Sequence, residues 1–318
     1  MTRKYPRVLL LGGSGFVGRH LATELAQRGY RVTLPCRRPD RLRELRVLPG
    51  LQLVEEADIT SREALDRHTR DQDAVVNLVG ILNESRKGDF RRLHVEFPQA
   101  VVEACQKNGV QRLLHMSALG ADQATGSSQY LRSKGEGENR VHTFGQKALT
   151  VTSFRPSVIF GPGDSFINRF ADLLKLCPWP LPYLPLSCPN SRFAPVYIGD
   201  LVRAMADSLE DEASFGQRID LCGPETWTLQ QVVEGVRDAL GKRCPVLPLP
   251  DGASRLLAGM LQHAPGKPFT PDNYQSLQTP SVCDRPCAQC RHRLSRYLRG
   301  LAGGHNRRPR LDAYRSRR

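Results

Sequence analysis

The chain of 318 residues carries 46 Lys and Arg against 32 Asp and Glu, a formal net charge of +14, with 40% hydrophobic and 7% aromatic residues. These fractions are typical of a globular protein and exclude a fibrous repeat, a disulfide-dense miniature scaffold and a chain that is disordered throughout. No apolar run in the sequence approaches the roughly 18 residues that a membrane-spanning helix needs. The sequence therefore predicts one large or two smaller folded domains.

Six short apolar segments predict β-strands, and segments with apolar residues at helical spacing separate them. The predicted strands are residues 7–11, 31–35, 51–56, 74–78, 112–116 and 150–155. The predicted helices are residues 17–29, 62–69, 95–108 and 130–141. Strands that alternate with helices require crossover connections and give a parallel sheet. Residues 1–160 are therefore predicted to form an α/β domain with a doubly wound, Rossmann-type parallel sheet.

The regular alternation ends after the last predicted strand. Prolines recur through residues 178–189 and predict an irregular loop, which forms either a lid over a site or one wall of an apolar pocket. A helix is expected from Ile198, and another between Thr228, a suitable N-cap, and Gly241, where a helix can stop. We expect residues 161–283 to form a smaller substrate-binding region that is partly interleaved with the first domain.

Residues 284–318 carry 11 Arg against two Asp, a net charge of +9 that leaves +5 of the total +14 for the rest of the chain. This composition predicts a basic, weakly ordered tail. The tail is either a solvated terminus or an arm that attracts anionic lipid, RNA or an acidic protein. The rest of the chain is only mildly basic, and nucleic acid is not expected to be a partner.

Nine cysteines are scattered along the chain without the regular spacing of a disulfide framework. An odd number of scattered thiols favours a reducing compartment and hence a cytoplasmic protein. Cys283, Cys287 and Cys290 are spaced C-x3-C-x2-C, which leaves open a metal or iron–sulfur site with His292 as a fourth ligand. The position of these thiols in a basic tail favours the alternative that they bind no metal.

The string Gly-Gly-Ser-Gly-Phe-Val-Gly joins the first predicted strand to the first predicted helix. Gly12 suits a tight turn, Gly15 lets the backbone approach a pyrophosphate, and Gly18 lets the helix pack closely on the strand. The free N–H groups and the positive dipole of the helix N-terminus attract a phosphate. We expect a dinucleotide to bind this loop through Gly12, Gly13, Ser14, Gly15, Phe16, Val17 and Gly18.

The residues after the second strand indicate which dinucleotide binds. An acidic side chain there would bind the ribose hydroxyls of NAD, but the sequence has Arg37 and Arg38. Two guanidinium groups suit the additional 2′-phosphate of NADP. NADP(H) is therefore preferred and NAD(H) is the alternative, unless both arginines are solvated surface charges.

Further cofactor contacts are expected where the third and fourth strands end. Asp58 either accepts a hydrogen bond from the adenine or caps the helix that follows it, and Ile59 adjoins it. Leu78, Val79 and Gly80 follow the fourth strand at the carboxyl edge of the sheet, where ligands bind in open sheets. Gly80 permits close approach of a cofactor, whereas core packing explains the two apolar residues equally well.

Tyr130 and Lys134 lie at i and i+4 of a predicted helix, so they share one face. A nearby ammonium favours phenolate over phenol and lowers the pKa of the tyrosine toward the range in which it exchanges a proton with a carbonyl or an alcohol. Ser117, just past the fifth strand, is a candidate hydrogen-bond donor to the substrate oxygen. These three residues predict the catalytic group of an oxidoreductase. We expect His115 to be structural and Asp200 to cap a helix.

Together these features resemble the short-chain dehydrogenase/reductase superfamily, in its extended or atypical, epimerase/dehydratase-like branch. The resemblance covers residues 6–283 and is carried by the glycine loop, Arg37, Asp58, Ser117, Tyr130, Lys134 and residues 155–164. Within this branch, three segments resemble bacterial relatives of the nucleotide-binding accessory subunit of mitochondrial complex I. These segments are residues 77–81, 115–120 and 130–134.

The resemblance implies a bound NADP(H), Tyr130 as the acid and base, and Ser117 as its polarising partner. It implies further cofactor contacts through Arg37, Asp58, Lys134, Pro156 and Ser157, with Lys134 bridging the nicotinamide ribose and the last two near the nicotinamide. By the same resemblance, the mitochondrial relative binds its nucleotide tightly and serves the assembly or stability of the respiratory complex, while other relatives are linked to quinone biosynthesis.

The sequence supports two main hypotheses about function. In the first, the protein is an NADP(H)-dependent oxidoreductase that acts on a small hydrophobic or quinone-like carbonyl compound or alcohol. In the second, it is a non-catalytic nucleotide-binding subunit or assembly factor that associates peripherally with a membrane complex, at the inner face of the membrane. A nucleotide-sugar epimerase or dehydratase is less favoured, because the interval between Ser117 and Tyr130 is shorter than in the sugar-nucleotide epimerases.

Overall fold

The computed structural model describes residues 3–145, 149–176, 183–285, 287 and 289–302. The chain forms two compact units. Unit 1 comprises Met1–Arg155 and Leu201–Asp220, and unit 2 comprises Pro156–Asp200 and Leu221–Arg318. Part of the predicted proline-rich loop, residues 177–182, and the last part of the predicted tail, residues 303–318, lie outside the described residues. None of the helices in the described part of the chain combines the length and the apolar character needed to span a bilayer.

Unit 1 is built on a seven-stranded sheet with the strand order β11-β6-β5-β4-β1-β2-β3. The strands are β1 (Arg7–Leu11), β2 (Arg31–Cys36), β3 (Leu51–Glu55), β4 (Ala74–Asn77), β5 (Arg112–Met116), β6 (Thr150–Pro156) and β11 (Arg218–Leu221). The first six pair in parallel, which confirms the predicted doubly wound α/β fold. Each predicted strand is confirmed to within one residue at either end. β11 is not predicted, because its four residues are too few to show an alternating pattern.

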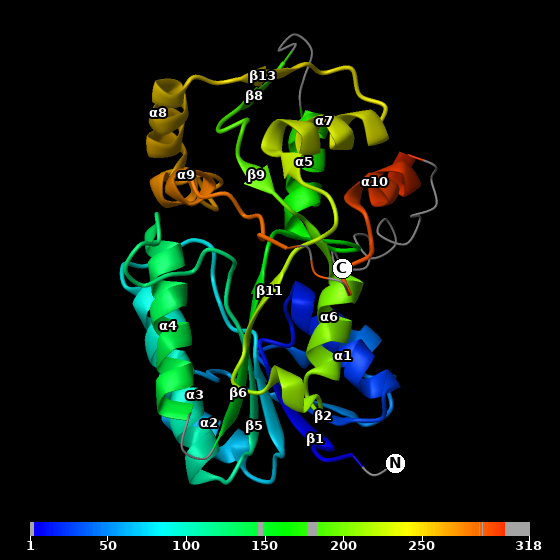
Figure 1. Cartoon of the computed structure of the whole chain (residues 1–318), viewed down its shortest axis with the longest axis vertical. Coiled ribbons are helices and arrows are strands. Elements are labelled where there is room, and N and C mark those ends of the chain that lie inside the picture. Colours follow the sequence, from blue (N-terminus) through cyan, green and yellow to red (C-terminus); the bar gives the residue numbers. More distant parts are fainter. Residues whose placement is uncertain (1–2, 146–148, 177–182, 286, 288, 303–318) are drawn as a thin grey trace. The chain divides into compact units, whose positions relative to one another are not determined.

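Helices cover both faces of the sheet, as the crossover connections require. They are α1 (Phe16–Gln27), α2 (Arg62–Thr69), η2 (Arg91–Glu96), α3 (Phe97–Lys107), α4 (Gln129–Gly145) and α6 (Ile198–Asp207), with the short turns η1 (Pro39–Leu45) and η3 (Glu212–Ser214). Figure 1 shows α2, α3 and α4 on one face of the sheet and α1 and α6 on the other. On the first face, Leu9, Val75 and Leu113 of the strands pack with Phe97 and Val101 of α3, and none of them is more than 3% exposed. Burial on both faces explains why these strands are almost continuously apolar.

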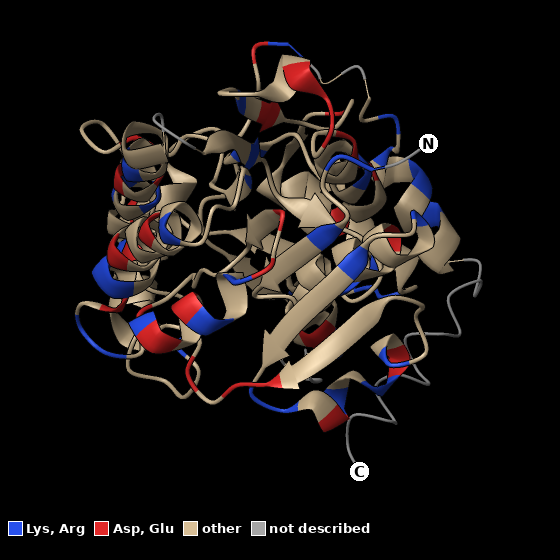
Figure 2. Cartoon of the chain, turned by 90° about the horizontal axis from the view of Figure 1, so that it is seen from below, with Lys and Arg blue, Asp and Glu red and all other residues tan. Residues whose placement is uncertain are grey.

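Acidic and basic residues lie side by side on the helices (Figure 2). Ion pairs of unit 1 include Arg7 with Asp73 at 2.9 Å and Arg140 with Glu136 at 2.8 Å. Partly exposed pairs of this kind contribute about 0–1 kcal/mol each, so they balance local charge more than they stabilise the fold. The excess positive charge of the chain is concentrated instead in residues 284–318.

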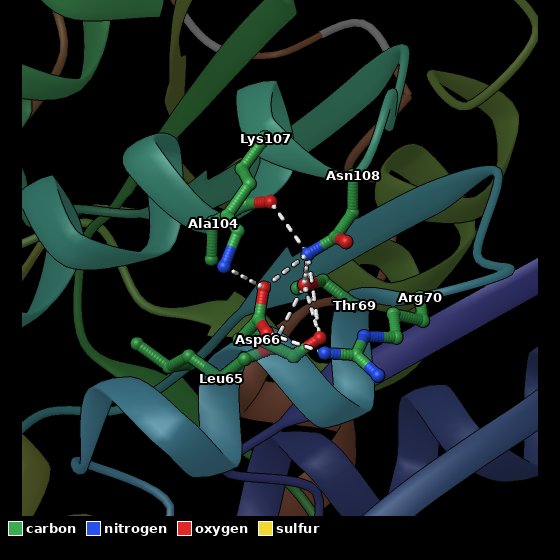
Figure 3. Close-up of polar contacts among 7 residues, drawn as sticks. All are labelled: Leu65, Asp66, Thr69, Arg70, Ala104, Lys107 and Asn108. Atoms are coloured by element: carbon green, nitrogen blue, oxygen red, sulfur yellow. Dashed lines mark hydrogen bonds and ion pairs between the residues drawn. The ribbon is translucent and has the colours of Figure 1, made fainter.

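A polar cluster around Asp66 joins α2 to α3 (Figure 3). The Asp66 carboxylate accepts a hydrogen bond from the Asn108 side chain at 3.1 Å and pairs with Lys107 at 2.9 Å and with Arg70 at 2.7 Å. The Asn108 amide also donates to the backbone oxygens of Asp66 and Ala104, at 3.3 and 3.2 Å. These oxygens belong to the last turns of α2 and α3, where carbonyl groups lack partners within the helix. One side chain therefore ties together the ends of two helices.

We expect Asp66 to make the stability of unit 1 depend on pH. Hydrogen bonds from Lys107, Asn108 and Arg70 hold the pKa of the Asp66 carboxyl well below its ordinary value of 3.8. A carboxyl whose pKa is lower in the folded chain stabilises the fold above the unfolded pKa and loses this contribution as the pH falls through the folded value. Urea unfolding should therefore show that Asp66→Asn lowers the free energy of unfolding near neutral pH, and that this difference shrinks below about pH 4.

The exposed Asp40, replaced by Asn in the same way, is the matched control for this measurement. A difference between wild type and Asp66→Asn that stayed constant from neutral to acidic pH would contradict the expected dependence.

In its described residues, unit 2 contains α5 (Ser165–Leu176), α7 (Leu229–Ala239), α8 (Asp251–Leu261), α9 (Pro271–Leu277) and α10 (Leu294–Ala302). Short strands pair β7 (Ile159–Phe160) with β10 (Val196–Tyr197), β9 (Arg192–Phe193) with β12 (Trp227–Thr228), and β8 (Leu184–Leu186) with β13 (Val246–Pro248). Thr228 forms a capping box with Gln231 at the start of α7, and Gly241 follows this helix with a φ of +64°. Both predicted ends of this helix are therefore confirmed.

The helix α10, which lies within the predicted tail, packs into the core of unit 2. Leu294 and Leu298 of α10 are 1% and 5% exposed and pack with Phe160 and Val232. The expectation of weak order from residue 284 onward rests on charge and composition and does not hold for α10. Leu294 and Leu298 lie at i and i+4 and form an apolar stripe, which leaves the arginines of this short helix on its other side.

Cys222 and Cys283 form a disulfide, which differs from the expectation of free thiols in a reducing compartment. The two cysteines are 61 residues apart in the chain, so no local spacing links them. Because Cys283 is in this disulfide, its sulfur is not available as a ligand of the metal or iron–sulfur site that the C-x3-C-x2-C spacing left open. Among the described residues, no group of three or more His, Cys, Asp or Glu side chains is arranged to hold a metal ion.

Candidate functional site

The strand order of the unit 1 sheet reverses between β1 and β4. In a doubly wound sheet, the loops after two such strands diverge and leave a crevice at the carboxyl ends, where ligands bind. Gly12 follows β1 and has a φ of +78°, a conformation that favours glycine. A Cβ atom on Gly12 would lie 3.0 Å from the backbone C of Leu78 and the backbone N of Val79. Glycine therefore allows the loop after β1 to approach the loop after β4.

The glycine loop fits a phosphate group at the start of α1. Gly15 is the N-cap residue with an extended backbone, and no described side chain caps this helix end or places an acidic group in its first turn. A Cβ atom on Gly15 would meet only the Gly12 carbonyl oxygen, at 3.4 Å, whereas a Cβ atom on Gly18 would lie 2.5 Å from the Cα of Gly13. The loop is therefore open where a pyrophosphate would approach and tightly packed behind, with the positive end of the helix dipole facing the opening.

Arg37 and Arg38 follow β2 directly, and both are exposed. Asp58 follows β3 and is exposed as well. Its Oδ1 accepts hydrogen bonds from the hydroxyl and the backbone N–H of Thr60, at 2.5 and 2.9 Å, and these bonds lower the pKa of the Asp58 carboxyl. The alternative that Asp58 caps α2 is wrong, because the Ser61 side chain accepts the capping hydrogen bond. Asp58 is thus an exposed, ionised carboxylate at the carboxyl edge of the sheet.

Asn77, at the end of β4, fixes the loop that follows. Its Oδ1 accepts from the backbone N–H of Val79 at 3.0 Å, and its Nδ2 lies 3.4 Å from Nδ1 of His115. Burial, together with the charge of Lys134, lowers the pKa of His115 well below its ordinary value, so this histidine is neutral. His115 therefore packs and orients Asn77, in keeping with a structural role. Val79 and Ile59 are partly buried against the core under α3.

Lys134 brings a buried cation to the loop after β4. It is 5% exposed and its Nζ donates to the carbonyl oxygen of Met116, at the end of β5, at 2.6 Å. A Cβ atom on Gly80 would lie 3.6 Å from this Nζ, so the ammonium lies beside the exposed backbone of Gly80. Burial lowers the pKa of Lys134 to about 8, against the opposing effect of Glu138. Lys134 therefore remains mostly protonated at neutral pH. Tyr130 lies one turn earlier on the same face of α4.

His94 is a buried histidine that no sequence pattern singles out. It lies in η2, a single turn of π-helix, and such turns recur at functional sites. Its Nε2 accepts from the backbone N–H of Ile81 at 3.0 Å, which requires the ring proton to lie on Nδ1 and to point at the hydroxyl of Ser133, 2.9 Å away. Ser133 in turn donates to the carbonyl oxygen of Tyr130.

The same histidine contacts the predicted acid and base directly. The rings of His94 and Tyr130 meet edge to face with centroids 5.6 Å apart. Burial, and then the charge of Lys134, lower the pKa of His94 to about 3, so the ring stays neutral. His94 therefore links the loop after β4 to α4 and orients Tyr130. Its partners lie far away in the chain, which is why spacing alone does not reveal it.

Ser117 is held by a buried carboxylate on α4. Its Oγ donates to Oε2 of Glu138 at 3.1 Å, and Glu138, which is 0% exposed, also accepts from Nε of Arg155 at 2.9 Å. Tyr130, Lys134 and Glu138 follow one another at intervals of four residues, so they share one face of the helix. The single hydroxyl hydrogen of Ser117 is used for Glu138, so Ser117 acts as a donor to another oxygen only after its hydroxyl rotates.

Residues 8–221 match the NAD dependent epimerase/dehydratase family. The chain belongs to this family. It is 29% identical over 265 residues to NADH dehydrogenase (ubiquinone) 1 alpha subcomplex subunit 9, mitochondrial, of Rattus norvegicus. This match covers 82% of this chain and 68% of the rat protein. The chain is also 28% identical over 262 residues to the ceramide reductase of Caulobacter vibrioides. This match covers 81% of this chain and 77% of the reductase. Both the predicted family and the resemblance to the complex I subunit are thus confirmed.

Solved structures of the same fold include UDP-glucuronic acid 4-epimerase from Bacillus cereus in complex with UDP-glucuronic acid and NAD. The likeness has a TM-score of 0.68 at 20% identity and covers 93% of this chain and 98% of that one. At this identity the likeness shows the fold. The chain spans about two thirds of the length of its mitochondrial relatives, at 68% for the rat protein and 66% for the 40 kDa subunit of Neurospora crassa.

Two predicted cofactor contacts of this family member, Pro156 and Ser157, belong to unit 2. Ser157 is 4% exposed and its Oγ donates to the backbone oxygen of Ser281 at 2.6 Å. The role of both residues at the nicotinamide stays a prediction.

The sequence predicts that Asp200 is the N-cap of a helix, and this prediction is wrong. Asp200 lies within the first turn of α6. Its carboxylate instead accepts from the backbone N–H and the Nδ1 of His292, at 3.0 and 2.7 Å.

Proposed function

We propose that this epimerase/dehydratase-family protein is an NADP(H)-dependent oxidoreductase that acts on a hydrophobic carbonyl compound or alcohol, with quinone-like molecules among its substrates. The observation that carries the proposal is that Tyr130 and the buried Lys134 lie one turn apart on the same face of α4, with the Lys134 ammonium beside the loop after β4. A site that only stores a nucleotide needs no acid/base pair. The relationship to a protein named ceramide reductase supports a hydrophobic substrate.

The residues that would hold NADP(H) come from the carboxyl edge of unit 1. The loop from Gly12 to Gly18 would hold the pyrophosphate at the start of α1. Arg37 and Arg38 would hold the 2′-phosphate, and Asp58 would accept from the adenine. The remaining contacts in this unit would come from Ile59, Leu78, Val79, Gly80 and Lys134. Contacts through Pro156 and Ser157 rest on the family resemblance alone. When bound, NADPH supplies a hydride to the substrate carbonyl carbon.

Tyr130 supplies the proton in this mechanism. Its hydroxyl donates the proton to the carbonyl oxygen during reduction, and the ammonium of Lys134 stabilises the phenolate that remains. His94 is neutral, so it orients the Tyr130 ring without taking up the proton itself. Ser117 polarises the substrate oxygen once its hydroxyl turns away from Glu138. In the reverse direction, the phenolate accepts the proton of the alcohol.

A second candidate is a non-catalytic NADPH-binding subunit or assembly factor of a respiratory membrane complex. The 29% identity to a mitochondrial NADH dehydrogenase subunit favours it. In this case the protein would be cytoplasmic and would associate peripherally with the inner face of the membrane. A nucleotide-sugar epimerase or dehydratase is the third candidate. It has support from the fold of UDP-glucuronic acid 4-epimerase, but the arginines after β2 and the short interval between Ser117 and Tyr130 disfavour it.

Oxidation of NADPH distinguishes the three candidates. The full chain is mixed with NADPH and, in separate reactions, with hydrophobic aldehydes, ketones and short-chain quinones, and the absorbance of the reduced nicotinamide is followed. Continuous oxidation with at least one of these compounds supports the oxidoreductase. Tight binding of NADPH without oxidation by any of them would favour the structural subunit. Interconversion of UDP-sugars without net loss of cofactor would favour the epimerase.

Replacing both Arg37 and Arg38 with Ser should change the dinucleotide preference. Hydrogen bonds to charged groups contribute about 1.5–3 kcal/mol each, so the loss of one such contact weakens NADPH binding by about tenfold or more. NADH lacks the 2′-phosphate, so its affinity should change little. Fluorescence titration measures the dissociation constants of NADPH and NADH and hence their ratio. Arg43 is exposed, and Arg43→Ser is the matched control. An unchanged ratio would mean that both arginines are solvated surface charges.

A further inference from the structure

The arm between Cys283 and α10 carries two cysteines three positions apart, Cys287 and Cys290, and neither of them is in a disulfide. Cys287 is partly exposed, and Cys290 is buried at 3% exposure. The backbone N–H of Cys290 donates to the carbonyl oxygen of Cys287 at 3.0 Å and closes a turn. The first and fourth Cα atoms of such a turn lie within about 7 Å. This distance overlaps the range of about 4.4–6.8 Å that a disulfide bridges.

The arm is anchored to unit 2 on both sides of this turn. Before it, Cys283 is bonded to Cys222. After it, His292 donates to the fully buried carboxylate of Asp200, and the backbone N–H and hydroxyl of Ser295 donate to the Glu225 carboxylate at 3.0 and 2.6 Å. Leu294 and Leu298 then pack into the core. These anchors fix the chain on either side of the two thiols and limit how far the thiols can move apart.

The surroundings of Cys287 favour its thiolate. The Cys290 thiol and the backbone N–H groups of Gln289 and Cys290 donate to the Cys287 sulfur. These hydrogen bonds lower the pKa of the Cys287 thiol to about 6, although burial and, to a smaller extent, the Asp200 carboxylate oppose them. Cys188, which is also partly exposed, differs in this respect, because burial raises its pKa to about 11. Thiolates, not thiols, attack disulfides, so Cys287 is the more reactive of the two. Cys290 is close enough to react next with the sulfur of Cys287.

We propose that Cys287 and Cys290 form a redox-active dithiol that reacts with low-molecular-weight disulfides. The Cys287 thiolate attacks one sulfur of the disulfide, whose S–S bond breaks and releases one thiolate with the electron pair. Cys290 then loses its proton, attacks the Cys287 sulfur of the mixed disulfide and releases the second thiolate. In sum, two cysteine thiols are oxidised to one disulfide and the small disulfide is reduced to two thiols.

Alkylation and oxidation of the full-length protein test the proposal. At neutral pH, iodoacetamide should modify Cys287 about 10- to 100-fold faster than Cys188, since the larger thiolate fraction outweighs the lower nucleophilicity of an acidic thiol. Glutathione disulfide should then produce a Cys287–Cys290 disulfide, seen by peptide mass spectrometry as the loss of two hydrogens. In Cys290→Ser the reaction should stop at a glutathione adduct on Cys287, and Cys287→Ser should give neither product. Cys188→Ser is the control and should behave as wild type.

Two observations on the wild-type protein alone would overturn the proposal, even if a variant fails to fold. One is that Cys287 reacts no faster than Cys188. The other is that both thiols of the turn are protected until a chelator removes a bound metal, which would make them ligands instead. A disulfide from Cys287 to Cys283 in place of Cys290 would also contradict the proposed pair.

Discussion

Tyr130→Phe is expected to lower the rate of NADPH oxidation about 100- to 10,000-fold, the usual contribution of a positioned general acid. The phenylalanine ring keeps the edge-to-face contact with His94 and the place of the side chain on α4, but it has no proton to donate. Affinity for NADPH should hardly change, because the residues proposed to hold the dinucleotide remain in place. Steady-state kinetics together with a fluorescence titration of NADPH separate the two quantities.

The exposed Tyr183→Phe is the matched control for the loss of a phenol hydroxyl elsewhere in the chain. It should leave both the rate and the affinity as in wild type. A Tyr130→Phe enzyme as active as wild type would mean that another group, or water, supplies the proton. A parallel loss of NADPH affinity and rate would instead assign Tyr130 to binding.

Arg112→Ala is expected to lower the free energy of unfolding by about 3 kcal/mol, the range found when a buried large side chain and its hydrogen bonds are removed together. Arg112 begins β5 and is 0% exposed, with its guanidinium 4.5 Å from the centroid of the Phe215 ring. It donates to the backbone oxygens of Thr150 and Ser208 and to the hydroxyls of Thr152 and Ser214, at 2.6 to 3.1 Å. Alanine would leave a cavity and buried acceptors without this donor.

Chemical denaturation of matched variants measures this effect. Arg31→Ala, at the exposed start of β2, should change the free energy of unfolding by no more than about 0.5 kcal/mol. Arg112→Lys retains a cation but has a single donor group, so it should fall between wild type and Arg112→Ala. A decrease of less than about 1 kcal/mol for Arg112→Ala would contradict this. It would show that the desolvation free energy of the buried guanidinium offsets the stabilisation from its hydrogen bonds.

Features that depend on neighbouring residues could be predicted from the sequence. The first six strands, the glycine loop and the Tyr130–Lys134 pair each depend on a few consecutive residues, so spacing and periodicity reveal them. The cap of α7 at Thr228 and its end at Gly241 are signals of the same local kind. These features suffice to predict a doubly wound sheet and the edge at which a dinucleotide would bind.

Features that depend on distant contacts could not be predicted. His94 and Glu138 act on Tyr130 and Ser117 only because η2, β5 and α4 meet in the folded chain. The Cys222–Cys283 disulfide joins segments that no spacing rule connects. The role of Asp200 depends on a distant contact as well, since an acidic residue early in a helix resembles a cap until its partner, His292, is known.

The central claim is that the protein transfers hydride between nicotinamide and a carbonyl carbon, and isotope transfer tests it most directly. NADPH carrying deuterium at C4 of the nicotinamide, in either of its two stereochemical forms, is mixed with the full-length protein and with the hydrophobic aldehydes and ketones already named. The account predicts a product with one deuterium on the former carbonyl carbon, delivered from only one of the two forms. Labelled NADPH that stays bound and fully deuterated with every compound would contradict it and would leave the structural subunit as the better account.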